Sequence, residues 1–546
     1  MSTHPIERPE PDGPGRPRLR PVPAAGACTA ATLAEQAADV ERERARAERT
    51  DDPRATERQH ARGKLTARER VALLLDPGTF TELGTFRRHE ASGFGLERQR
   101  PYTDGVVTGW GLVHGRKVFV YAHDFRIFGG ALGAAQAAKI QRVQDLALSV
   151  GAPIVGLNDG AGARIQEGVA ALDGYAGIFR RNVQSSGTIP QVSVILGPCA
   201  GGAAYSPALT DFVFMVDGTS HMFLTGPDVV AAVTSERVTQ EELGGSAVHG
   251  ARSGVASFVA ATEEACLADV RYLLSLLPAN HGEPPPAYEP DDDPGRRCDR
   301  LLDVVPTDPR RPYDIRAVAR EIVDDGELME VHERWATNVV CALARLDGHV
   351  VGIVGNQPLS KAGVLDIDAS EKAARFVRTC DTFNIPLVTL VDVPGFLPGV
   401  DQEHAGVIRV GAKLLYAYCE ATVPRVQVVL RKAYGGAYIV MDSLGTGSDL
   451  SFAWPTNEIA VMGASGAASV VHRRELAAAH DPERLREELA AAYAAELMHP
   501  YNAAERGFVD EIIDPRDTRR VLVEGLRMLR TKDRPVPARR HGNPPM

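Results

Sequence analysis

The pattern of apolar and polar positions divides most of this chain into short buried strands and helices. Residues 429–441, VLRKAYGGAYIVM, open with apolar residues, pass through Gly435-Gly436 and end in a second apolar run. This order predicts a strand, a tight glycine turn and the start of a helix. Residues 192–211, VSVILGPCAGGAAYSPALTD, have the same order around Gly201-Gly202. The chain therefore carries one supersecondary unit twice.

The spacing between the two units recurs elsewhere. The offset along the chain from Gly202 to Gly436 matches, to within a single position, the offset between the strand-like runs that end at Asp159 and Asp392. Two landmarks in register indicate an internal duplication. We therefore predict an α/β fold made of two copies of one domain.

Further elements are expected in both copies. Alternating apolar residues predict hairpins over 106–128 and 342–355, with turns at His114-Gly115 and Asp347-Gly348. Buried strands are predicted over 152–159 and 385–392. Helices are predicted over 31–49, from Thr66 to Asp76, from Phe128 to Val150, over 370–383 and over 473–498.

Proline-rich segments mark the expected boundaries. The segment 1–28 holds prolines throughout, which predicts a disordered tail over 1–30. Residues 277–297 combine prolines with an acidic cluster and predict a linker. We therefore place the N-terminal domain at 31–295 and the C-terminal domain at 296–546. The last twenty residues are expected to form a basic, proline-containing tail.

Composition narrows the possible functions. With 44% hydrophobic residues and a mean hydropathy of −0.15, the 546-residue chain is typical of a globular protein. A net charge of −10 argues against nucleic-acid binding, which needs cations to neutralise phosphates. No apolar run is long enough to span a membrane, and no signal peptide is present, so we expect a cytoplasmic protein without a membrane partner. The seven cysteines are scattered and contain no C-x-x-C pair, so neither disulfides nor a zinc site are expected.

The glycine turns are the best candidates for chemistry. Backbone N–H groups at such a turn, at the positive end of a helix, can stabilise a developing oxyanion. The chain contains no G-x-S-x-G, H-E-x-x-H or phosphate-loop motif, and Ile165 replaces the third glycine of a dinucleotide fingerprint after Gly160 and Gly162. The duplicated chain therefore offers two groups of backbone amides, each of which could form an oxyanion hole.

Several strings together give the chain a specific resemblance. They are ARGKLTARERVALLLDPGTF at 61–80, ARIQEGV at 163–169, GPCAGGAAYSPALTDF at 197–212, MFLTGPDVV at 222–230, VTQEELGG at 238–245, DVPGFLPGVDQE at 392–403, RKAYGGAY at 431–438 and AWPTNEIAVMGA at 453–464. With these strings the chain resembles the carboxyltransferase (β) subunit of biotin-dependent acyl-CoA carboxylases of the propionyl-CoA/acetyl-CoA carboxylase type. The resemblance implies two crotonase-like (ββα superhelix) domains and a homo-hexamer whose sites form between subunits.

The resemblance also implies roles for particular residues. Gly201 and Gly202 would hold the thioester oxygen of an acyl-CoA, and Gly436 with Ala437, next to Gly435, would hold the ureido oxygen of biotin. The residues expected on the substrate side are Gly162, Ala163, Arg164, Tyr205 and Ile439. The chain departs from the family at 159–162, where D-G-A-G replaces the commoner D-S-G-G. The turn glycines are kept, so we expect the same chemistry.

The implied reaction needs a partner. No Met-Lys dipeptide is present to carry biotin, so a biotin carboxylase and biotin carboxyl carrier α subunit is expected to supply carboxybiotin. The cofactor would be biotin on that partner, with no metal in this subunit. The substrate would be a short- or medium-chain saturated acyl-CoA, and the product malonyl-CoA, methylmalonyl-CoA or an alkylmalonyl-CoA. The apolar Ile439 favours a broad acyl range.

Two other functions remain open from the sequence. One is a biotin-dependent decarboxylase or transcarboxylase subunit, whose motifs overlap with these. The other is a biotin-free hydratase or isomerase of the crotonase fold, which would need a side-chain acid or base beside the first glycine turn. Glu167 is the only nearby candidate for that role.

Overall fold

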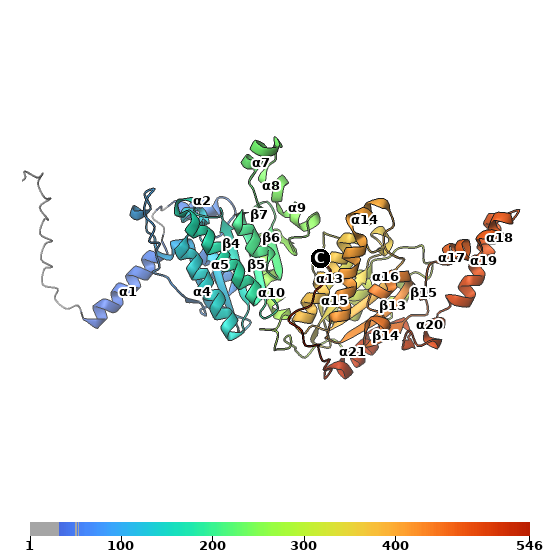
Figure 1. Ribbon diagram of the computed structural model, residues 1–546. Coiled ribbons are helices and arrows are strands. Elements are labelled where there is room, and N and C mark those ends of the chain that lie inside the picture. The colour runs from blue at the N-terminus through green and yellow to red at the C-terminus, as the bar shows by residue number, and fades with distance from the viewer. Residues whose placement is uncertain (1–31, 50–51, 53, 546) are drawn as a thin grey trace, which may run out of the picture. The chain divides into compact units, whose positions relative to one another are not determined.

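The computed structural model describes residues 32–49, 52 and 54–545 and divides the chain into two units, 1–49 and 50–546 (Figure 1). The described part of the first unit contains one helix, α1 (Leu33–Ala47). Thr32 and Glu35 form a capping box at its start, which satisfies two amide groups that a helix leaves free. The predicted disordered tail, 1–30, lies outside the described residues.

The first half of the second unit is built on a mixed sheet with the order β1-β2-β3-β4-β5-β6-β8, and β7 pairs with β5. The β2–β3 hairpin is antiparallel, and the strands from β3 onward are parallel. The strands are β1 (Thr81–Glu82), β2 (Val106–Val113), β3 (Arg116–His123), β4 (Ile154–Gly160), β5 (Gln191–Ala200), β6 (Phe212–Val216), β7 (His221–Phe223) and β8 (Phe258–Ala260).

The second half repeats this sheet with the order β9-β10-β11-β12-β13-β14-β16, and β15 pairs with β13. The hairpin register is the same, because Val106 pairs with His123 and, at one common offset along the chain, Val339 pairs with Asn356. The predicted duplication is therefore present in the sheets. The strands are β9 (Leu328–Glu330), β10 (Val339–Leu346), β11 (His349–Asn356), β12 (Leu387–Val393), β13 (Arg425–Tyr434), β14 (Leu450–Ala453), β15 (Glu458–Ala460) and β16 (Glu511–Ile512).

Helices cover both faces of each sheet. In the first half, α4 and α5 pack side by side on one face (Figure 1), and the apolar contacts place α3 with α10 on the other. Side chains of β3 alternate between these two cores, as a strand requires. The helices are α2 (Ala55–His60), α3 (Ala67–Leu74), α4 (Ala134–Val150), α5 (Val169–Ser185), α6 (Gly202–Ala208), α7 (Pro227–Thr234), α8 (Gln240–Gly244), α9 (Ser246–Ala251) and α10 (Glu263–Leu276).

In the second half, α13 and α15 cover one face of the sheet, and α12 with α21 cover the other. The helices are α11 (Leu301–Val304), α12 (Ile315–Ile322), α13 (Ile367–Thr382), α14 (Val400–Ala405), α15 (Val407–Glu420), α16 (Gly435–Val440), α17 (Ala464–Val471), α18 (Arg473–Ala478), α19 (Pro482–Leu497), α20 (Asn502–Glu505) and α21 (Thr518–Leu529). Short 3₁₀ turns are η1 (Leu96–Arg98), η2 (Tyr102–Gly105), η3 (Phe128–Gly130), η4 (Ile165–Glu167), η5 (Asp324–Gly326), η6 (Lys361–Gly363), η7 (Leu444–Thr446) and η8 (Pro515–Asp517).

The duplication extends to the helix before each sheet. In the first half Arg68 of α3 pairs with Glu82 of β1 at 2.7 Å, and in the second half Arg316 of α12 pairs with Glu330 of β9 at 2.6 Å. Both residues of the second pair follow those of the first at one common offset. From β2 and β10 onward, the offset between equivalent residues of the two halves is shorter. The reason is that the segment between β1 and β2 is longer than the segment between β9 and β10. Helices α3 and α12 therefore occupy equivalent places.

Two predicted helices differ from the structure. The helix expected from Phe128 begins at Ala134, because η3 comes first and brings Gly130 so close to the Asp159 carbonyl that a Cβ would overlap it. The helix expected over 473–498 is two helices, α18 and α19, since Pro482 starts the second and cannot continue the first. The other predicted hairpins, strands and helices are confirmed within five residues at their ends, including the Thr66 cap of α3.

The two halves share a hydrophobic core. The layer of α3 and α10 and the layer of α13 and α15 belong to one continuous apolar cluster, and Arg375 donates to the carbonyl of Thr210 across it at 3.0 Å. The domain boundary near residue 295 stays a prediction. Among residues 32–545 that the structure describes, no helix combines the length and apolarity needed to cross a membrane.

Candidate functional site

The first glycine turn lies where β5 ends and α6 begins. Gly201 has φ +60°, a left-handed conformation that glycine adopts without strain, and its N–H donates to the Phe223 carbonyl at 3.0 Å. Helix α6 starts at Gly202, so the N–H groups of Gly202 and Ala203 have no partner inside the helix. These two amides, rather than that of Gly201, are the donors that a ligand oxygen could use.

The second glycine turn has the same form at the end of β13. Gly435 has φ +58°, and α16 starts there, which leaves the N–H groups of Gly436 and Ala437 without partners in the helix. A Cβ at Gly436 would meet no atom within 4 Å. Both turns stand at the carboxyl ends of parallel strands, where ligand sites of open α/β sheets lie.

The residues expected on the substrate side fall into two groups. Gly162 accepts from the Leu132 N–H at 2.8 Å, and a Cβ on Gly162 would lie 2.9 Å from the Ala200 carbonyl, so this loop, with Ala163, adjoins the first glycine turn. Tyr205 and Ile439 occupy equivalent places after the two turns and are 52% and 48% exposed. The structure therefore brings Gly162 and Ala163 beside the first turn and leaves both larger side chains available to a ligand or a neighbouring subunit.

Arg164 is buried and has its own partners. Its Nη1 donates to Asp104 at 2.8 Å and to Glu167 at 2.7 Å, and its guanidinium lies 4.4 Å from the centre of the Phe128 ring. Burial raises the pKa of Asp104, and the Arg164 charge opposes that rise. The side chain thus fixes the loops around the first turn, and contact with a ligand would require it to leave two carboxylates.

Glu167 is held in the same way. Its Oε1 accepts from Arg164, and its Oε2 accepts from the Ala134 N–H at 2.8 Å, which caps the start of α4. Its side chain is only 4% exposed. With both oxygens occupied, Glu167 is poorly placed to act as the acid or base of a hydratase.

A small cavity lies under the first glycine turn. It measures about 20 Å³ and is lined by Tyr121, His123, Leu132, Ile140, Asn158, Tyr175, Ile178, Ala203 and Ser206. Burial lowers the pKa of His123 to about 4, so the imidazole is neutral at pH 7. The Tyr175 ring lies 3.0 Å from where a Cβ of Gly202 would stand. Contact with the Tyr175 ring therefore fixes the position of the first residue of α6.

A buried carboxylate stands behind each turn. Asp159 at the end of β4 contacts Lys64 at 2.7 Å and Arg70 at 2.9 Å, and Asp392 at the end of β12 contacts Arg431 at 2.9 Å. Sequence reasoning missed these groups. The string ARGKLTARER contains Lys64 and Arg70, but nothing in the sequence indicates that they reach a strand so much later in the chain.

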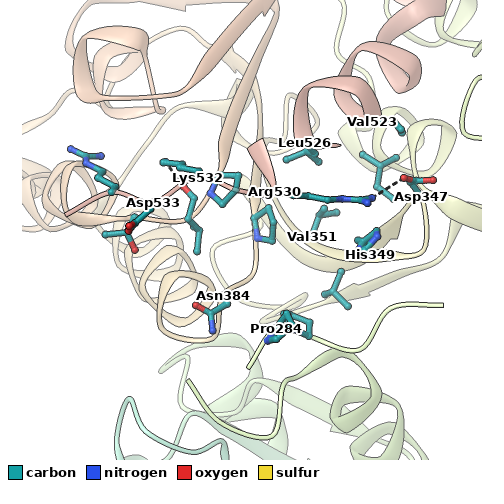
Figure 2. Close-up of a pocket in the computed structure, with 18 residues that line it drawn as sticks. Pro284, Asp347, His349, Val351, Asn384, Val523, Leu526, Arg530, Lys532 and Asp533 are labelled. Carbon is teal, nitrogen blue, oxygen red and sulfur yellow. Dashed lines mark hydrogen bonds and ion pairs between the residues drawn. The ribbon is translucent and has the colours of Figure 1, made fainter. Parts of the chain in front are cut away.

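A larger cavity lies elsewhere, at the amino ends of β11, β12 and β13 (Figure 2). It measures about 340 Å³, and two of its cations are paired: Arg530 donates to Asp347 at 3.0 Å, as Figure 2 shows, and Lys532 donates to Asp449 at 2.7 Å. Parallel strands put their amino and carboxyl ends at opposite edges of a sheet. This cavity is therefore on the edge opposite the second glycine turn.

Known proteins match almost the whole described chain. The carboxyl transferase domain family matches residues 58–544. The carboxyltransferase subunit of propionyl-CoA carboxylase from Haloferax mediterranei is 58% identical over 488 residues, which cover 89% of this chain and 95% of that protein. The α subunit of methylmalonyl-CoA decarboxylase from Propionigenium modestum is 51% identical over 490 residues, which cover 90% and 95%.

A solved structure has the same fold. Transcarboxylase 12S, described as a hexamer with methylmalonyl-CoA and methylmalonic acid bound, superposes with a TM-score of 0.92 and 49% sequence identity over 95% of this chain and 99% of that one. The predicted fold class, two duplicated crotonase-like α/β domains, is confirmed.

Proposed function

This chain belongs to the carboxyl transferase family, and from that membership we propose that it transfers a carboxyl group from carboxybiotin on a partner protein to the α-carbon of a short- or medium-chain saturated acyl-CoA. It is an enzyme, a carboxyltransferase of the propionyl-CoA carboxylase and transcarboxylase type. The observation that carries the finer proposal is the pair of glycine turns, one at the carboxyl edge of each duplicated sheet.

The first turn suits the thioester. The free N–H groups of Gly202 and Ala203 would bind the thioester oxygen and stabilise the negative charge that grows on it as the α-proton leaves. A well-placed donor of this kind contributes about 3 to 4 kcal/mol to a transition state. Gly162 keeps the neighbouring loop close to the strand end without a side chain that would fill the approach.

The second turn suits the ureido oxygen of biotin. Because no atom lies within 4 Å of a Cβ position at Gly436, a planar ring could approach the N–H groups of Gly436 and Ala437 closely. When bound, carboxybiotin supplies the carboxyl group and a ureido nitrogen able to accept a proton. That chemistry needs no side-chain base, which agrees with the engagement of Glu167 by Ala134 and Arg164.

A second function is favoured by one relative. The similarity to the methylmalonyl-CoA decarboxylase α subunit of Propionigenium modestum supports a chain that works in the reverse direction, taking a carboxyl group from an acyl-CoA to biotin. The same two turns would serve, since a catalyst accelerates both directions of one step. The biotin-free hydratase has no comparable support.

Assembly and location belong to the same proposal. We infer that the chain forms a homo-hexamer, as the transcarboxylase 12S structure is described, and receives biotin from an α subunit that carries biotin carboxylase and carrier functions. The exposed positions of Tyr205 and Ile439 agree with sites completed by a neighbouring subunit. A cytoplasmic location stays a prediction.

Reconstitution tests the proposal. The purified chain, given ATP, bicarbonate and propionyl-CoA, is expected to form no carboxylated product, and addition of a biotinylated α subunit is expected to start the reaction. Radioactive bicarbonate fixed into acid-stable product measures the result. Carboxylation by the chain alone would contradict the assignment of biotin to a partner, and a failure of every biotinylated partner would leave the decarboxylase as the better assignment.

A further inference from the structure

The strand that leads into each glycine turn has the same bulge. Between β4 and β5 the regular pairing stops at Asn158 and resumes at Gly160, so that one residue, Asp159, faces three residues of β5, 196–198. Between β12 and β13 a single residue, Asp392, likewise faces 430–432. A bulge re-aims the strand that carries it. Each buried aspartate therefore stands where the strand bends toward its turn.

In the second half, the bulged strand itself supplies the hydrogen-bond donors for the Asp392 carboxylate. Arg431 Nε donates to the carboxylate at 2.9 Å, and the N–H of Lys432 donates to its other oxygen at 3.2 Å. The remaining Arg431 Nη1 donates to three carbonyls of the loop before α12, those of Pro306, Asp308 and Arg311. The bulge is thus fixed by one cation and one amide from its own strand.

In the first half, both of these groups are missing. The residues equivalent to Arg431 and Lys432 are Gly197, which has no side chain, and Pro198, which has no N–H. A Cβ at Gly197 would overlap the Asp159 carboxylate, so a side chain is excluded there. Asp159 is fully buried, and a buried carboxylate needs a partner charge.

The cations come instead from the segment around α3. Arg70 Nη1 donates to Asp159 at 2.9 Å, Arg70 Nη2 donates to the bulge carbonyl of Leu196 at 3.2 Å, and Lys64 Nζ donates to Asp159 at 2.7 Å. Glu263 of α10 accepts from Arg70 at 2.6 and 2.8 Å. The result is a buried quartet with two positive and two negative side chains, which ties β4, β5 and α10 together.

The arginine that pairs with the buried aspartate lies on a helix in the first half and on the bulged strand in the second half. Helix α12 is equivalent to α3, and the residue at the place of Arg70 is Val318, which is buried in an apolar core. The first half therefore has arginine on the helix and glycine on the bulge, and the second half has valine on the helix and arginine on the bulge. In each half one arginine guanidinium donates to the aspartate, but the arginine comes from a different structural element.

We propose that Arg70 and Lys64 are positioning residues of the first glycine turn, as Arg431 is of the second. They hold the β5 bulge through Asp159 and Leu196, and this fixes the direction in which the strand delivers Gly202 and Ala203 to the acyl-CoA. They do not touch the ligand. The inference rests on the proposed function, because it assigns the first turn to the acyl-CoA and the second to biotin.

The two routes allow a matched experiment. The variant Arg70→Met/Glu263→Gln removes one charge of each sign and leaves the Lys64–Asp159 pair, so the site stays neutral and the protein should fold. The control Arg431→Met/Asp392→Asn also removes one charge of each sign, here the cation and the carboxylate of the second bulge. For each, the dissociation constant of propionyl-CoA and the KM for free biotin, in carboxyl transfer from methylmalonyl-CoA, are measured together with thermal unfolding.

We expect the first variant to weaken propionyl-CoA binding about tenfold while the KM for biotin stays within about twofold, and the control to show the reverse, since small misplacements of binding groups are costly. Arg70→Lys keeps the charge but cannot donate to both Asp159 and the Leu196 carbonyl as the guanidinium does. Its dissociation constant for propionyl-CoA should lie between those of the first variant and the unsubstituted protein. Equal changes in both constants, or no change in either, would overturn the positioning role. Absence of carboxyl transfer in the unsubstituted protein would overturn the proposed function itself.

Discussion

Gly436 offers a single-residue test of the second glycine turn. Its φ lies outside the left-handed region and its missing side chain faces open space, so Gly436→Val should leave the fold intact. The branched side chain would keep a ligand oxygen away from the amide. Because loss of one oxyanion donor costs about 10²–10³ in kcat, we expect carboxyl transfer to fall about 100-fold or more with an unchanged Tm.

Gly202→Val is the informative comparison, since its Cβ would lie 3.0 Å from the Tyr175 ring and should lower the Tm as well as the activity. Steady-state transfer assays and thermal unfolding of both variants give the result. Nearly normal turnover in Gly436→Val would remove that amide from the site.

Ile439 is the residue from which acyl selectivity can be tested. It is 48% exposed beside the second turn, where an apolar side chain can line an acyl pocket without the desolvation cost of a carboxylate. We expect Ile439→Asp to shift the ratios of kcat/KM among acetyl-, propionyl-, butyryl- and hexanoyl-CoA, by about 1 to 3 kcal/mol for each methylene that gains or loses contact. An unchanged profile in the reconstituted enzyme would show that this side chain does not contact the acyl group.

The two equivalent hairpins differ in what packs against their turns. Gly115 and Gly348 are equivalent turn residues with φ +73° and +71°, but a Cβ at Gly115 meets nothing within 4 Å, whereas one at Gly348 would overlap the Tyr288 carbonyl of the linker. Gly115→Ala should cost about 1 to 2 kcal/mol of unfolding free energy, the strain of a left-handed alanine. Gly348→Ala should cost about 1 to 3 kcal/mol more, because the linker must move.

Urea or thermal unfolding of the two variants measures this difference. Equal losses of unfolding free energy in the two variants would mean that the linker at Tyr288 moves without an energetic cost. A larger loss for Gly115→Ala would contradict the packing of residues 277–297 on the second hairpin.

Elements with strong local signals could be predicted from the sequence, and their tertiary partners could not. The hairpins, the strands before each glycine turn and the Thr66 cap follow from alternation and capping residues within a few positions. The equivalence of α3 and α12 was hidden because the longer β1–β2 segment changes the offset between the two halves. The exchange of Arg70 for Arg431 was hidden for a second reason: a buried ion pair leaves no local pattern in either segment.

At the scale of the molecule, duplication explains how one chain can offer two oxyanion sites of different use. The two sheets keep the same strand order, bulge and glycine turn, so the backbone geometry is shared. What differs is the surroundings, with Gly162 and Tyr175 at the first turn and open space at Gly436. A common scaffold with separate surroundings is what transfer between two unlike substrates requires.

An enzyme assembled from copies of this chain should transfer a carboxyl group without its biotin-carrying partner. The most direct measurement incubates the purified, folded chain with methylmalonyl-CoA labelled in its free carboxyl group and with free biotin, without ATP or a partner, and follows label in carboxybiotin and the appearance of propionyl-CoA. We expect transfer that saturates with methylmalonyl-CoA and falls about 100-fold or more in Gly436→Val. Absence of labelled carboxybiotin, from a protein that binds the CoA ester and unfolds cooperatively, would show that the chain has no carboxyl transfer site.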